Sequence, residues 1–180
     1  QAKAQTIYGT TTANELVSFN ATSPSVILST STITGITPGQ TIEGLDFRPN
    51  TGHLYAFGYD ATTTTYQLYT INLSTGVAVS INMPTTIALG SGPIGFDFNP
   101  TVDRIRVVSA NGGNFRLHPV TGAIAFTDGS LAYATGDPNQ GMIPNIVVAA
   151  YDNSYIGSAV TELYNYDNSL NVLTEQNPPN

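Results

Sequence analysis

A short segment of this chain occurs twice, and an internal repeat constrains the fold more strongly than any other sequence feature. Leu45-Asp-Phe-Arg-Pro49 recurs as Phe96-Asp-Phe-Asn-Pro100, 51 residues further along, and a glycine precedes each copy, Gly44 and Gly95. A second matching segment follows each copy, ending in a Thr-Gly pair at Gly76 and at Gly122. The period of about fifty residues predicts one structural unit built several times.

A fainter copy lies near the C-terminus. Ala150-Tyr151 stands where Asp97-Phe98 would fall, and residues 163–167 resemble residues 68–72. Asn171 takes the place of the turn glycine in this copy. The substitution is physically reasonable because asparagine tolerates the left-handed backbone conformation better than most other residues.

A partial copy opens the chain. Ile7-Tyr8 resembles Leu54-Tyr55, but no segment before it matches residues 43–48. The first unit is therefore expected to have about three strands, one fewer than the others. We treat residues 1–6 as a separate N-terminal segment.

Alternation of apolar and polar residues, with a period of two, marks half-buried strands in each copy. In the best copy it predicts strands near 43–48, 53–58, 66–72 and 77–82. Four antiparallel strands in some fifty residues are typical of a propeller blade. We predict an all-β, β-propeller-like repeat of about four four-stranded antiparallel blades, the first incomplete, near 7–33, 43–82, 94–127 and 146–174. A flat stack or sandwich of hairpins is the alternative.

The composition excludes several classes of partner. Only 9% of the 180 residues are charged, the net charge is −7, and Lys3 is the one lysine. A nucleic-acid binder needs a basic surface, and so does a protein that binds anionic membranes. No apolar run reaches the roughly 20 residues of a membrane helix. With no cysteine, the chain has neither disulfides nor thiolate metal sites. This low-charge, Thr- and Asn-rich sequence favours a secreted, extracellular or cell-surface protein.

The repeated segments resemble a bacterial family of unknown function, DUF4394. The similarity is carried by residues 44–56 and most specifically by 95–109, with further runs at 68–76, 114–122 and 176–179, and it covers about residues 6–180. It implies a secreted or surface-attached, propeller-like module, and it brings no assigned activity.

Few residues are candidates for metal binding. His53 and His118 lie in different blades without ligand spacing, so we interpret both as turn residues. Asp46 and Asp97 share one repeat position. There they would either line a channel or bind calcium, or they would accept backbone N–H bonds or pair with an arginine. We favour the second interpretation because Ala150 replaces the acid in the last copy. No cofactor is predicted, although weak calcium binding by loop acids stays open: Asp60, Asp128 and Asp137.

The arginines form a second candidate site. Arg104 and Arg106 are two residues apart on one predicted strand, and Arg116 lies on the next. With Asp97 and Asp103 they are expected to form one cluster, which we interpret as a structural ion-pair network. The alternative is a site for an anion or a uronic acid, because guanidinium groups pair well with carboxylates.

The sequence contains no Gly-x-Ser-x-Gly elbow and no other catalytic motif, so we predict that the protein is not an enzyme. We expect an extracellular structural subunit of a matrix or filament that forms homo-oligomers through strand edges. The alternative is a carbohydrate- or surface-binding adhesion module with a polysaccharide partner. The expected inter-subunit contact is the N-terminal segment Gln1, Ala2, Lys3, Ala4, Gln5 and Thr6.

Overall fold

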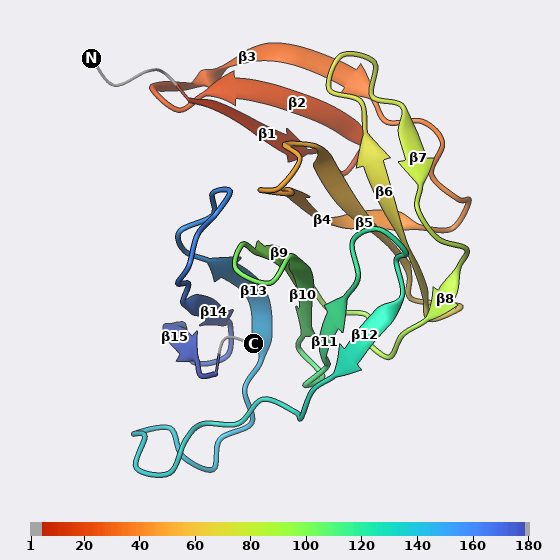
Figure 1. The fold of residues 1–180 in the computed structure, drawn as a ribbon. Coiled ribbons are helices and arrows are strands. Elements are labelled where there is room, and N and C mark those ends of the chain that lie inside the picture. Colours follow the sequence, from red (N-terminus) through yellow and green to blue (C-terminus); the bar gives the residue numbers. More distant parts are fainter. Residues whose placement is uncertain (1–4, 179–180) are drawn as a thin grey trace.

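The computed structural model describes residues 5–178, and every regular element in that range is a β-strand. The strands form four antiparallel sheets that follow one another in chain order around an arc (Figure 1). The chain is therefore an all-β, propeller-like repeat, as predicted. We call the sheets blades 1 to 4.

Blade 1 contains three strands, which confirms that the first blade is incomplete within the described residues. They are β1 (Thr6–Thr10), β2 (Glu15–Asn20) and β3 (Ser23–Thr32). Blade 2 contains β4 (Thr41–Phe47), β5 (Leu54–Asp60), β6 (Thr65–Ile71) and β7 (Ala78–Ser80), and the short β8 (Thr85–Thr86) also pairs with β6. Blade 3 contains β9 (Ile94–Asn99), β10 (Arg104–Ser109), β11 (Asn114–Leu117) and β12 (Ile124–Thr127).

Blade 4 differs from the prediction of four strands, because it has three: β13 (Ile146–Tyr151), β14 (Leu163–Asp167) and β15 (Val172–Gln176). The second strand of the repeat would fall within residues 152–162, which form turns and loops instead. Asn153 and Gly157 have φ angles of 51° and 81° there, which an extended strand does not permit. As a result, β13 pairs directly with β14.

The repeat also explains the turn before the last strand of each blade. Asn72, His118 and Asp167 occupy one repeat position, and each accepts two backbone N–H bonds from the following turn. Asn171 has a φ of 56°, so it does replace the turn glycine. His118 therefore has a structural role in a turn, as expected from the sequence.

Three hydrophobic clusters lie between successive blades rather than in one central core. The largest joins blades 2 and 3 and includes Phe57, Phe96 and Phe98. The second, around Leu16 and Tyr69, joins blades 1 and 2, and the third joins blades 3 and 4. The first strands of blades 2, 3 and 4 pack in series, β4 on β9 and β9 on β13, and we call these three the inner strands. The junctions between inner strands therefore hold the blades in order.

Candidate functional site

The two repeated aspartates join one inner strand to the next. Asp46 Oδ2 accepts the N–H of Phe98 at 2.8 Å, and Asp97 Oδ2 accepts the N–H of Tyr151 at 2.6 Å. Phe98 and Tyr151 occupy the same repeat position in successive blades. The interpretation of these acids as acceptors of backbone N–H groups is thus confirmed.

The glycine two residues before each aspartate allows the inner strands to approach closely. A Cβ atom on Gly44 would lie 2.4 Å from Phe96 Cβ, and one on Gly95 would lie 2.7 Å from the backbone nitrogen of Ala149. No side chain fits at such distances without movement of the neighbouring strand. The sequence Gly-x-Asp is therefore a docking signature: the glycine admits the next blade and the aspartate bonds to its backbone.

Blade 4 carries no such signature on its inner strand. Val148 and Ala150 occupy the positions of the glycine and the aspartate, and both are exposed, Val148 by 51%. A side chain at the glycine position blocks close approach, and alanine offers no acceptor. This face of β13 is consequently unsuited to the junction found between blades 2 and 3 and between blades 3 and 4.

The two aspartates also influence each other's ionisation. Burial raises the pKa of Asp97 to about 8, and the neighbouring charge of Asp46 adds to the rise. Burial likewise raises the pKa of Asp46, although its bonds from Phe98 and Phe47 favour the ionised form. The interaction between the two side chains favours the ionised form of Asp46 and the protonated form of Asp97.

This pair makes stability depend on pH in an unusual direction. The folded state keeps the proton of Asp97 up to about pH 8, whereas the unfolded chain loses it near the ordinary value of 3.8. Between these values the folded state binds more protons, so the free energy of unfolding falls as pH rises. We expect the melting temperature to drop by several degrees between about pH 5 and pH 8. Asp97→Asn, which keeps a donor and an acceptor, should remove most of that drop.

Thermal melts followed by circular dichroism at both pH values test this prediction. Asp60→Asn is the matched control, because Asp60 ends β5 before an exposed turn, and hydrogen bonds from Thr63 and Thr62 in that turn lower its pKa. Its contribution to stability is lost only when the pH falls below 4, so this variant should keep the drop. A wild-type melting temperature that is flat or rises between pH 5 and pH 8 would contradict the coupling.

A second polar group lies in blade 3. Arg106, whose side chain is 1% exposed, and Arg116 both bind Asp128, at 2.6 and 2.8 Å. Arg106 also donates to Asn114 Oδ1 at 2.7 Å, and Arg116 lies over the ring of Phe126. Burial disfavours the ionised form of Asp128, but the two guanidinium groups outweigh it and lower the pKa of this carboxyl.

The five residues expected as one cluster are divided among four sets of partners, which corrects that prediction. Arg106 and Arg116 share Asp128, while Asp103 pairs with Arg48 of blade 2 at 2.5 Å. Arg104 donates to the backbone carbonyls of Val102 and Asp103, and Asp97 belongs to the junction with blade 4. Asp128 was missed as a partner because it lies just beyond β12, where the antiparallel register and not the sequence spacing brings it to the arginines.

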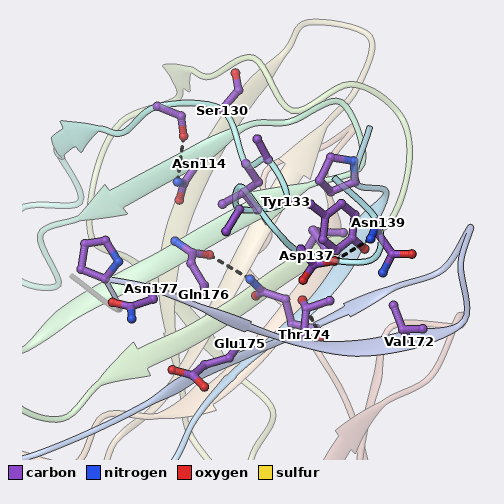
Figure 2. Close-up of a pocket in the computed structure, with 18 of the residues that line it drawn as sticks. Asn114, Ser130, Tyr133, Asp137, Asn139, Val172, Thr174, Glu175, Gln176 and Asn177 are labelled. Carbon is purple, nitrogen blue, oxygen red and sulfur yellow. Dashed lines mark hydrogen bonds between the residues drawn. The ribbon is translucent and has the colours of Figure 1, made fainter. Parts of the chain in front are cut away.

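Next to this group is a pocket of about 810 Å³ between the loop of residues 128–145 and blade 4. Figure 2 shows Tyr133 and Asp137 of the loop across from Thr174 and Gln176 of β15. Tyr133, the one aromatic residue of this loop, donates its hydroxyl to Asp167 Oδ2 at 2.7 Å. The lining combines amides, carboxylates and one aromatic ring. A polysaccharide partner stays a prediction, which a glycan array tests.

The remaining predicted residues are placed as follows. Gln5 accepts the N–H of Ala21 through its carbonyl, and Thr6 opens β1 opposite Asn20, so both belong to the chain's own blade 1. Residues 1–4 lie outside the described range, and the inter-subunit role of the segment stays a prediction. Among residues 5–178 no three His, Asp or Glu side chains gather as a metal site requires. The same range holds no helix long and apolar enough to cross a membrane.

Comparisons with known proteins bear on the family and the fold. A family model described as "Domain of unknown function (DUF4394)" matches residues 15–180, in agreement with the resemblance seen in the sequence. A search of curated proteins finds no match. Among solved structures, BamB from Moraxella catarrhalis is similar, with a TM-score of 0.36 and 12% sequence identity. The similarity covers 96% of this chain and 49% of BamB, so the chain spans about half the length of that protein.

Proposed function

Because the chain belongs to the DUF4394 family, whose function is unknown, we propose a function from the chain's own geometry. We propose that it is a non-enzymatic structural or surface protein outside the cell, and that its copies associate edge to edge through β3. The observation that carries the proposal is the unusual exposure of this strand.

Strand β3 is the longest in the protein, with ten residues, and nine of them are exposed. In the described part of the chain it pairs only with β2, so its other edge presents free backbone groups. Val26, Ile27 and Leu28 are 55%, 51% and 58% exposed in its centre, and no charged residue lies between Glu15 and Glu43. A long, uncharged edge strand with an exposed apolar centre is a template for pairing with another chain.

The roles of the polar groups support a structural protein. Asp46 and Asp97 hold inner strands together, His118 orders a turn, and Arg106 is buried against Asp128. These side chains are engaged within the fold. The low charge content of 9% supports a place outside the cell, as the sequence suggested.

The double variant Val26→Lys/Leu28→Lys tests the proposal. Both side chains are more than half exposed, so the fold should stay within about 0.5 kcal/mol of the wild type. Positive charges on an edge strand oppose pairing between copies, and we expect the dissociation constant of self-association to rise at least about tenfold. Light scattering coupled to size-exclusion chromatography over a range of concentrations measures this change.

Val120→Lys is the matched control, because Val120 is 61% exposed but lies in a turn. This variant should associate like the wild type. The proposal fails if the wild-type chain stays monomeric at high concentration, or if the double variant assembles equally well.

A further inference from the structure

The inner edge of blade 1 repeats the arrangement of the other blades with one strand fewer. By its place in the repeat, β1 corresponds to β5 and β10, which are the second strands of blades 2 and 3. Strands β5 and β10 each pair on one side with an inner strand, β4 or β9. Among residues 5–178, β1 pairs only with β2. Its other edge is therefore the position of an inner strand.

The contact between blades 1 and 2 contains the aromatic pair that is also found between blades 2 and 3. Tyr8 of β1 meets Phe47 of β4 edge to face, with ring centroids 5.6 Å apart. The same contact recurs one blade later, where Tyr55 of β5 meets Phe98 of β9 at 5.1 Å. Tyr8 and Tyr55 share a repeat position, as do Phe47 and Phe98. At this contact β1 lies against β4 as β5 lies against β9. In blade 2 the same arrangement includes an inner strand paired with β5.

The missing half of the junction is an aspartate that would accept the N–H of Phe47. The equivalent N–H groups, of Phe98 and Tyr151, are each bound by the aspartate of the preceding blade. Phe47 instead donates to the side chain of its own neighbour, Asp46, at 2.7 Å. Leu45 and Phe47 are only half-buried, whereas Phe96 and Phe98 in the matching positions are buried.

We propose that the free edge of β1 is an acceptor site for an extended segment of a partner polypeptide with the sequence Gly-apolar-Asp-apolar. The pairing of β4 with β5 places Asp46 opposite Tyr55 and Gly44 opposite Phe57. The same register on β1 places the partner's aspartate opposite Tyr8 and its glycine opposite Thr10. The aspartate then accepts the N–H of Phe47, and the glycine admits Leu45. The partner thus adds a strand to the sheet, and its glycine and aspartate determine the specificity of binding. The edge that it uses belongs to β1 and not to β3.

A fluorescent peptide with the sequence of residues 92–99, Gly-Pro-Ile-Gly-Phe-Asp-Phe-Asn, tests the proposal against the full chain. We expect saturable binding by fluorescence anisotropy. Changing the peptide's aspartate to alanine, or its second glycine to valine, should each weaken binding about tenfold or more, through a lost charge-assisted bond and a steric block respectively. The variant Val26→Lys/Leu28→Lys should bind the peptide like the wild type, which separates this site from self-association through β3.

Because the chain contains no cysteine, a disulfide can report the register. Thr6→Cys should cross-link to a peptide with cysteine in place of its last asparagine, since the predicted register puts these two residues opposite each other. Thr51→Cys, in an exposed turn, is the control and should not cross-link. The proposal is overturned if the peptide does not bind saturably, if the alanine and valine peptides bind equally well, or if both cysteine variants cross-link to the same extent.

Discussion

Gly95→Val is expected to lower the free energy of unfolding by about 3 kcal/mol or more, because the new side chain overpacks the junction between blades 3 and 4. The first added carbon would lie 2.7 Å from the backbone nitrogen of Ala149 and 2.7 Å from Val108 Cγ2. The backbone of β13 cannot change conformation as a flexible side chain can, so the whole strand must move away from β9. A loss of that size corresponds to a fall in melting temperature of roughly 10 °C for a chain of this length.

Hydrogen exchange should show where the loss occurs. Amides of β13, β14 and β15 should lose protection in Gly95→Val, while those of β5 and β6 keep more of theirs. Gly129→Val is the matched control, since a Cβ on Gly129 meets nothing within 4 Å. If Gly95→Val melts within a degree of the wild type, the glycine is not what allows the close approach of the two inner strands.

Arg106→Ala is expected to have a similar or larger effect, about 3–5 kcal/mol, because it removes a large, fully buried side chain together with its charge-assisted bonds. Arg106 is 1% exposed and donates to Asp128 and Asn114, so its removal leaves two acceptors short of a donor and opens a cavity. Arg106→Lys should recover only part of the loss, since an ammonium group cannot match the fork of the guanidinium. Chemical denaturation of the three proteins measures the differences.

Arg104→Ala serves as the control for this prediction. Arg104 is on the same strand but half-buried, and it donates only to backbone carbonyls beside it. Its loss should cost less than about 1 kcal/mol. Equal effects of the two alanine variants would show that burial of Arg106 against Asp128 contributes little to stability.

Much of the fold follows from the sequence alone because the relevant signals are local. Alternating residues predicted the strands, and the repeat predicted four blades with the first one short. Asn171 was recognised as a turn residue because a left-handed backbone position favours glycine or asparagine, and the structure has it at a φ of 56°. The sequence also favoured backbone N–H groups or an arginine as partners of Asp46 and Asp97 over a calcium ion, because Ala150 replaces the acid in the last copy, and the structure shows the backbone bonds.

The partners of charged side chains and the free edges were decided by the tertiary structure. Arg48 and Asp103 are 55 residues apart and meet only because blades 2 and 3 pack side by side. Arg106 and Arg116 share Asp128 because the register of β11 and β12 brings it there, and no sequence spacing encodes that register. Residues 152–162 occupy the place of the second strand of the repeat, but they form turns and loops instead. Local periodicity sets which segments become strands, whereas contacts a few ångströms long depend on how whole blades are packed.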